Sequence, residues 1–450
     1  MKRYTHILLF FCVFVSIADC RLLLAQYDFQ NPFISPPVPV GSGARAIGMG
    51  SAFIAVADDA TAASWNPGGL TQLRRPEFSV VYAYNKRFED YSSPTHPEAS
   101  GNHNTTMEDL NYLSVAYPFE LCQRNMLISL NYQMLYSFDR NLKFDYNTVA
   151  NETKTSLNTE YDFRQRGSLK TLSPAYCIQV TPHLSLGATF NIWTDELFWG
   201  NGWNSTNNIT KKQYYNHRPE SKTYTSEYQR YSSFKGFNMN LGFLWKVNQM
   251  LTIGGVLKTP FRAEVKYKKT VTNKRIQLTD RSYSVSENSP ATKKEDLDFY
   301  MPLSYGAGMA LRFSDKLTVS GDVTITDWSK FVLEDSQGRR YSPITGKPTK
   351  DSHVHATTQV RLGGEYLFIL TNTVIPVRAG LFYDPEPAQN HANDFWGCSL
   401  GTGVSLGNLI LDIAYQFRYG RNVNGTALDM PQRDADVSQH SFLASAIYHF

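Results

Sequence analysis

Apolar and polar residues alternate along most of the chain with a period of two. The pattern is clearest in Leu184–Ile192, Lys316–Thr326 and Leu409–Tyr419, where leucine, isoleucine, valine and aromatic residues occupy every second position. Side chains on a β-strand point alternately to opposite faces, so each segment is predicted to be a strand with one apolar and one polar face. A soluble β-sandwich and a membrane β-barrel both show this alternation.

The lengths of the connections separate these two folds. Short turns and long polar loops alternate between the predicted strands, as in bacterial outer-membrane barrels, where short turns face the periplasm and long loops face outward. A sandwich has no reason to sort its loops in this way. We therefore predict an all-β fold, a transmembrane antiparallel barrel of about fourteen strands over residues 77–450, with both barrel ends periplasmic. The predicted strands are 77–84, 108–119, 126–138, 164–180, 184–198, 231–247, 250–269, 295–313, 317–332, 353–368, 374–383, 395–406, 409–420 and 439–450.

Two segments before the barrel do not alternate. Lys2 and Arg3 precede the apolar run Ile7–Ala18, which predicts a signal peptide over residues 1–25. A buried N-terminal helix is the alternative. Residues 26–76 are rich in Gly, Ala and Pro with scattered apolar residues, and a wide barrel needs filling or leaves a channel. This segment is predicted to be a hatch folded inside the lumen, or otherwise a periplasmic extension.

Composition excludes several other classes of protein. The longest apolar run has twelve residues, too short for a spanning helix of ~20, and a net charge of +4 gives no reason to expect a nucleic-acid partner. Beyond the signal peptide, Cys122, Cys177 and Cys398 match no metal or disulfide framework, and His353 and His355 lack a third nearby ligand. No spacing suggests a catalytic triad. We expect neither an enzyme nor a cofactor or metal site.

The alternation places a set of charged side chains on the lumen face, because Arg or Lys facing lipid costs about 2–4 kcal/mol near the midplane. Two interpretations remain open: a network that holds the hatch to the wall, or a cation that binds a ligand carboxylate, for which Lys258 and Arg262 are the candidates. Within the hatch, Arg45 is expected to pair with Asp58 and Asp59. The lumen residues are Lys258, Arg262, Glu264, Arg312, Asp322, Arg361, Glu365, Arg378, Asp412 and Arg418.

Several motifs resemble those of a known family. Gly43–Gly50, Ala57–Ala60 and Trp65-Asn66-Pro67-Gly68-Gly69-Leu70 resemble the N-terminal hatch of the FadL/TodX family of outer-membrane transport proteins. The family has Asn-Pro-Ala where this chain has Asn66-Pro67-Gly68. The resemblance continues through Lys258–Arg262, Thr326–Ser329, Val377–Gly380 and Tyr383-Asp384-Pro385. It therefore covers nearly the whole mature chain.

The resemblance implies a monomeric barrel that takes up hydrophobic compounds passively, such as long-chain fatty acids or aromatic hydrocarbons. It also implies a gate at Asn66-Pro67-Gly68 beside a kinked third strand, 126–138, although no Pro or Gly marks a kink there. The motif is otherwise an ordinary tight turn. Tyr224, Tyr228, Tyr231 and Phe234 are expected to form either an outer capture surface or an aromatic girdle.

A second function remains open on the same scaffold. The hatch pattern is also similar to that of PorV-like barrels, which dock secreted cargo proteins in a type IX secretion system. In either case we expect the outer membrane of a Gram-negative-type bacterium. The expected partners are outer-membrane lipids, lipopolysaccharide, a hydrophobic small-molecule ligand, and the barrel-assembly machinery through the final strand ending at Phe450.

Overall fold

The computed structural model describes residues 38–39, 41–94, 96–150, 154–197, 200–278, 282–424 and 434–450. The predicted signal peptide, residues 1–25, lies outside the described residues. So does most of the beginning of the predicted hatch, residues 26–37 and 40.

Fourteen antiparallel strands form a closed barrel, which confirms the predicted fold class. Each strand pairs with the next barrel strand along the chain, and the first pairs with the last, from Glu77 opposite His449 to Ser92 opposite Asp434. Closure leaves no unpaired edge in the membrane, where lipid cannot satisfy backbone groups. The barrel strands are β2 (Glu77–Ser92), β3 (Gly101–Leu121), β4 (Arg124–Ser137), β6 (Thr155–Gln179), β7 (Leu184–Trp193), β9 (Arg218–Lys246), β10 (Leu251–Lys258), β14 (Ser304–Arg312), β15 (Leu317–Thr326), β18 (Thr357–Ile369), β19 (Val374–Tyr383), β20 (Phe395–Leu406), β21 (Leu409–Asn424) and β22 (Asp434–His449).

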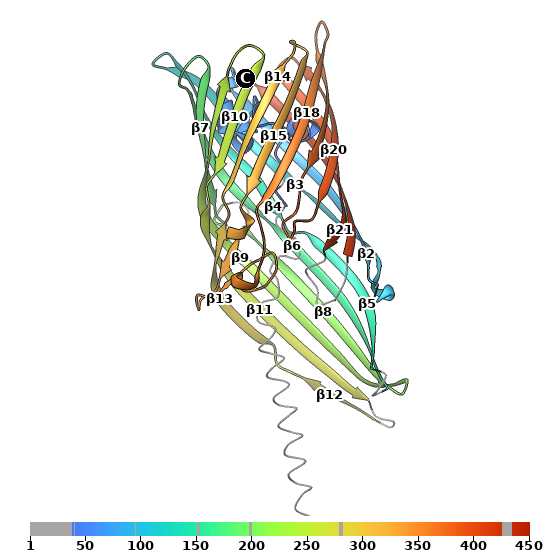
Figure 1. Ribbon diagram of the computed structural model, residues 1–450. Coiled ribbons are helices and arrows are strands. Elements are labelled where there is room, and N and C mark those ends of the chain that lie inside the picture. The colour runs from blue at the N-terminus through green and yellow to red at the C-terminus, as the bar shows by residue number, and fades with distance from the viewer. Residues whose placement is uncertain are drawn as a thin grey trace, which may run out of the picture.

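The two faces of the wall differ as the alternation predicts. On β9, Phe237 and Trp245 are 52% and 46% exposed on the outside, whereas Asn238 and Asn240 are buried inside. An outward apolar band and a polar lumen are the expected arrangement for a barrel in lipid. The short turns and the C-terminus share one end of the barrel (Figure 1). Because short turns of outer-membrane barrels face the periplasm, this end is assigned to the periplasmic side.

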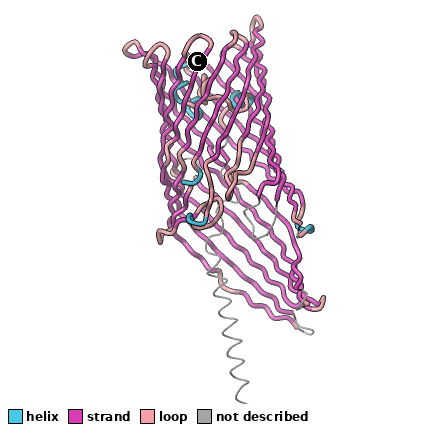
Figure 2. Tube along the Cα trace, in the orientation of Figure 1, coloured by secondary structure: helices cyan, strands magenta, loops and turns pink. Residues whose placement is uncertain are grey.

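At the other end, a sheet extends well beyond the barrel rim (Figure 1, Figure 2). The loops expected at 139–163, 199–230 and 270–294 are mostly paired strands, so that part of the prediction is wrong. Polar strands carry no apolar alternation, and their pairing to neighbours is not visible in the local sequence. The extension consists of the parts of β6 and β9 beyond the barrel rim, together with β5 (Arg140–Ala150), β8 (Gly202–Tyr215), β11 (Phe261–Leu278), β12 (Tyr283–Glu287) and β13 (Ala291–Met301).

Residues 41–75 run inside the barrel near its periplasmic end (Figure 1). Helix α2 (Ala44–Gly48) packs against β20 and β21, and η1 (Pro67–Gln72) packs against β6, β7 and β9. Helix α3 (Ala62–Trp65) leads into η1. The remaining short elements are β1 (Val38–Pro39), β16 (Val332–Glu334), β17 (Arg340–Tyr341), η2 (Pro97–Ala99), η4 (Trp328–Lys330) and η5 (Thr349–Asp351).

Among the described residues, no helix has both the length and the apolar character needed to cross a membrane.

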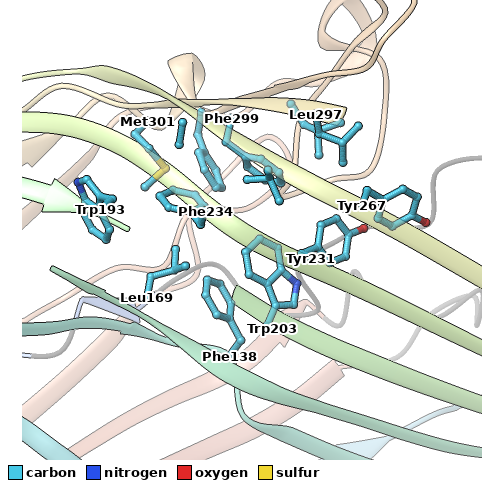
Figure 3. Packing of buried hydrophobic residues seen from close by; sticks show 14 of the residues in the cluster. Phe138, Leu169, Trp193, Trp203, Tyr231, Phe234, Tyr267, Leu297, Phe299 and Met301 are labelled. Atoms are coloured by element: carbon cyan, nitrogen blue, oxygen red, sulfur yellow. The ribbon is translucent and has the colours of Figure 1, made fainter. Parts of the chain in front are cut away.

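The two largest apolar clusters among the described residues lie in the interior. The hatch supplies most of the first, which includes Met49, Phe53 and Leu70 packed against wall residues such as Leu127. The second, called here the aromatic cluster, includes residues of the extension strands β8, β11 and β13 (Figure 3). It joins wall residues to the segment 328–354, which folds inward, and its rings lie close together: Phe138 and Trp203 have centroids 4.5 Å apart. Its members are Phe138, Leu169, Trp193, Trp203, Tyr231, Phe234, Ala263, Val265, Tyr267, Leu297, Phe299, Met301, Trp328, Phe331, Leu333, Ile344 and Val354.

Candidate functional site

A cavity of about 250 Å³ lies between the hatch and the aromatic cluster. Hatch residues line its periplasmic side, among them Ile47, Ile54 and Trp65. A dry engineered cavity of about 150 Å³ is enough to hold benzene. The cavity therefore has room for an aromatic ring or a short length of alkyl chain.

One wall of the cavity is apolar. It continues the aromatic cluster, and Trp193 and Phe261 lie nearly parallel with ring centroids 5.4 Å apart. The indole of Trp193 donates a hydrogen bond to the Asn238 side chain at 2.9 Å, which fixes the ring and satisfies its buried N–H. The apolar lining residues are Leu135, Tyr136, Trp193, Val256, Phe261, Met301 and Trp328.

The opposite wall is charged, and its charges are mostly paired. Arg418 contacts Glu386 at 2.7 Å and Asp384 at 3.3 Å, while Arg87 contacts Glu386 at 3.4 Å. Arg361 lies 3.7 Å from Asp384. Sequence reasoning placed Arg418 and Arg361 in the lumen but missed Arg87 and Glu386, because both lie outside the predicted strands. The nearby Asp384-Pro385 motif was the one available signal.

Lys258 also lines the cavity, at the end of β10. Among the described residues its ammonium has no carboxylate within 4 Å and no hydrogen-bond acceptor. It therefore differs from Arg87, Arg361 and Arg418, which share the cavity and have carboxylate partners. A partly desolvated cation without a counter-ion favours an anionic group of a ligand.

The lumen placement predicted for Arg262 needs correction. Its side chain is 55% exposed on the outer face of β11 and lies 2.8 Å from Asp298, whereas its neighbour Ala263 is buried inside. Strict alternation puts positions 258 and 262 on one face, but the strand breaks at Thr259-Pro260. Proline cannot donate to a ladder and often ends a strand. The alternation therefore restarts with the opposite phase in β11, and Glu264 is also outside.

The Asn66-Pro67-Gly68 motif packs tightly against the wall. Asn66 is fully buried, and its side-chain amide donates to the carbonyls of Ile54 at 2.7 Å and Phe243 at 2.8 Å. Its side-chain oxygen accepts from the Gly68 N–H at 3.0 Å and caps η1. The motif therefore joins two parts of the hatch to β9.

Glycines in the wall make this close approach possible. A Cβ on Gly187 would lie 2.2 Å from the Pro67 carbonyl oxygen, and one on Gly242 would lie 2.1 Å from the Asn66 side-chain oxygen. Similar contacts recur across the lumen, where Cβ atoms on Gly363 and Gly380 would meet Met49 and Gly50 at 2.1 and 2.2 Å. No residue with a side chain fits at these positions without moving the hatch.

Buried ion pairs hold α2 to the opposite side of the wall. Arg45 pairs with Asp58 at 2.5 Å and with Glu365 of β18 at 2.9 Å. Arg378 of β19 then links Glu365 to Asp412 of β21, with both contacts at 2.6 Å. These residues lie beneath the cavity and do not line it. They form the hatch-to-wall network that was one of the two interpretations.

Other predicted site residues contact the hatch backbone. Asp322 accepts from the Ile54 N–H at 2.8 Å, and Arg361 donates to the Gly50 carbonyl at 3.3 Å. Asp59 does not pair with Arg45 but accepts from the Thr61 N–H at 2.8 Å. Burial raises the pKa of the Asp59 carboxyl to about 7, although Arg45 opposes the shift. Arg312 is exposed at the periplasmic rim.

Two further predictions, a gate beside the third barrel strand and an outer aromatic surface, differ from the structure. β4 carries a bulge between Met134 and Tyr136, so its irregularity needs neither Pro nor Gly. Asn66-Pro67-Gly68 lies mainly against β6, β7 and β9. Tyr231 and Phe234 are 4% and 1% exposed inside the aromatic cluster, which excludes them from a girdle or an outer surface.

Within the described ranges, no group of three or more His, Cys, Asp and Glu side chains is arranged to hold a metal ion.

Comparisons with known proteins agree on the fold. A Pseudomonas aeruginosa FadL homologue has a TM-score of 0.57 at 14% identity, covering 93% of this chain and 99% of that one. The Pseudomonas putida toluene transporter TodX scores 0.55 at 12% identity, covering 91% and 98%, and the Ralstonia pickettii toluene transporter TbuX scores 0.50 at 14%, also covering 91% and 98%. A search of curated protein sequences finds no significant match.

A family profile described as "Outer membrane protein transport protein (OMPP1/FadL/TodX)" matches residues 24–420. This match covers both the hatch and most barrel strands. The closed barrel, the packed hatch and the internal cavity are consistent with it. The chain therefore belongs to the OMPP1/FadL/TodX family of outer-membrane transport proteins.

Proposed function

We propose that this protein carries hydrophobic compounds passively across the outer membrane, and that its preferred ligands combine an apolar body with an anionic head, as fatty acids and aromatic carboxylates do. The observation that most supports this proposal is Lys258. It is an unpaired cation beside the apolar wall of the cavity, which includes Trp193 and Phe261. Binding sites of this kind are mostly apolar with a few placed polar groups.

The proposed route leads from the outside past the aromatic cluster to the cavity, and then past the hatch. We propose that the signal peptide spans residues 1–25, that the hatch spans residues 26–76, and that Asn66-Pro67-Gly68 acts as the inner gate. Its two amide bonds to Ile54 and Phe243 hold it closed against the wall. The protein is proposed to act as a monomer, with β22 and Phe450 recognised by the barrel-assembly machinery.

Docking of secreted cargo is less well supported. A cargo-binding barrel has no need for a half-apolar internal cavity with an unpaired cation above the hatch. The described interior instead provides space for a small ligand.

Replacing Lys258 with methionine should weaken fatty-acid binding by roughly 10- to 100-fold. The substitution keeps the volume of the side chain but removes a charged hydrogen-bond donor, which contributes about 1.5–3 kcal/mol. Binding of toluene, which has no charge, should change less than threefold. Both affinities can be measured on purified protein by tryptophan fluorescence, since Trp193 and Trp328 line the cavity.

Lys316→Met is the matched control, because Lys316 is exposed in a periplasmic turn far from the cavity. It should leave both affinities unchanged. Equal loss of fatty-acid and toluene binding in Lys258→Met would contradict the proposed carboxylate contact. Wild-type protein that binds neither ligand would contradict the transport proposal itself.

A further inference from the structure

Four cations on neighbouring strands of the extension lie in one row. Arg166 of β6 is paired with Asn204 of β8, and Asn204 is paired with Arg230 of β9. Arg230 is in turn opposite Lys268 of β11, which is opposite Lys294 of β13. Residues directly opposite one another project from the same face, and adjacent strands are about 4.8 Å apart. Arg166, Arg230, Lys268 and Lys294 are called the cationic rung.

The rung faces away from the lumen. Arg230 is flanked by Gln229 and Tyr231, which are buried inside, and Lys268 follows Tyr267 of the aromatic cluster. All four rung side chains are exposed, as is Asn204 between them. The strands that carry them lie side by side beyond the barrel rim (Figure 1).

None of the four has a carboxylate within 4 Å among the described residues, although neighbouring cations of the extension do. Lys212 contacts Glu160, Arg262 contacts Asp298, and Lys269 contacts Glu227. The outward acidic residues near the rung include Asp296, two positions from Lys294, and Asp162, four positions from Arg166 and paired with Arg164. The rung is thus a row of four exposed cations that form no ion pair within the described part of the chain.

The rung lies a short distance above the lipid-facing band. On β9 the outward apolar residues end at Phe237, and Arg230 follows seven residues further along. With about 3.3 Å per residue and a strand tilt of about 40°, Arg230 lies roughly 15–20 Å above Phe237. The headgroup layer itself is only about 5–8 Å thick. The rung therefore projects into the sugar layer that covers an outer membrane.

We propose that the cationic rung binds the phosphate groups on the inner core sugars of lipopolysaccharide. These phosphates are anionic, closely spaced and attached to the lipid that surrounds the barrel in the outer leaflet. Guanidinium groups bind phosphate oxygens in pairs, and ammonium groups bind them as point charges. Arginine at one side of the row and lysine at the other cover about four strand spacings, which suits an extended sugar chain with several phosphates.

The test compares a neutral rung with a matched control. The rung variant carries Arg166→Gln, Arg230→Gln, Lys268→Gln and Lys294→Gln. The control carries Lys211→Gln, Arg275→Gln, Lys316→Gln and Lys350→Gln, four exposed cations elsewhere that produce the same change in net charge. Native mass spectrometry on purified protein measures binding of lipopolysaccharide with phosphorylated core sugars, the same lipopolysaccharide with unphosphorylated core sugars, and lipid A alone.

The rung variant should bind the phosphorylated form at least about tenfold more weakly than wild type, since it loses four basic residues that would each attract an anionic surface. The control should bind it as wild type does. Lipid A and the unphosphorylated form should bind all three proteins alike. Equal binding of the phosphorylated form by the rung variant and the control would overturn the proposal, as would stronger binding of lipid A alone by wild type than by the rung variant. None of these outcomes depends on the transported ligand.

Discussion

Replacing Arg378 with methionine should release the hatch from the wall. Arg378 is 4% exposed and contacts Glu365 and Asp412, both buried. Glu365 keeps its contact with Arg45, but Asp412 is left without a cation among the described residues. Removing one partner of a buried pair costs about 3–5 kcal/mol, and displacement of the hatch recovers part of this cost because water then reaches the Asp412 carboxylate. Hydrogen exchange of residues 44–60 and sugar uptake by proteoliposomes should both rise.

The double variant Arg378→Met with Asp412→Leu provides the decisive control. It removes the carboxylate that the single variant leaves unpaired, so hatch protection should return most of the way to the wild-type level. Arg312→Met, at an exposed position of the rim, should have no effect. If the single variant keeps the wild-type exchange rates, the ion pairs do not hold the hatch.

Alanine at Gly187 or Gly242 should displace the Asn66-Pro67-Gly68 segment. The new Cβ would lie 2.2 Å from the Pro67 oxygen or 2.1 Å from the Asn66 oxygen, and the nearest atoms belong to backbone or to a fully buried side chain. Overpacking of this kind costs about 1–3 kcal/mol. We expect faster hydrogen exchange in residues 66–72 and raised solute uptake in both variants.

Gly321→Ala on β15 is the matched control. Its Cβ would meet no atom closer than 3.6 Å, and it lies in the same kind of strand. It should leave exchange and uptake at wild-type levels. Unchanged hydrogen-exchange rates of residues 66–72 in Gly187→Ala and Gly242→Ala would mean that the hatch does not contact the wall closely at these glycines.

The barrel could be predicted from the sequence because lipid and lumen impose opposite demands on alternate residues. That constraint ends at the membrane surface. In β8 and the part of β9 beyond the barrel rim, most side chains on both faces are polar, so the apolar alternation is lost and the pairing of Asn204 with Arg230 has no local signal. The extension was therefore predicted as loops. The break at Pro260 had the opposite effect, since it reverses the phase of the pattern and moves Arg262 outside.

Part of the candidate site could also be predicted from the alternation of apolar and polar residues. Alternation assigned Lys258, Glu365, Arg378 and Asp412 to the lumen, and the structure places them there. It did not reveal that three of them form the hatch-to-wall network while Lys258 lines the cavity without an ion-pair partner among the described residues. That distinction depends on Arg45, which lies 320 residues from Glu365. Contacts over such sequence distances follow from barrel closure and from the docking of the hatch.

The wall glycines also constrain the order of biogenesis. Gly187 of β7 and Gly242 of β9 contact one side of the hatch. Gly363 of β18 and Gly380 of β19 contact the other side, and these two strands are synthesised much later. Because the wall contacts the hatch backbone on both sides, a closed barrel leaves no room for the hatch to enter afterwards. The β2–β22 seam should therefore close last, around a hatch that already lies on the nascent sheet. We therefore expect barrel closure to require a hatch that has already docked on the sheet.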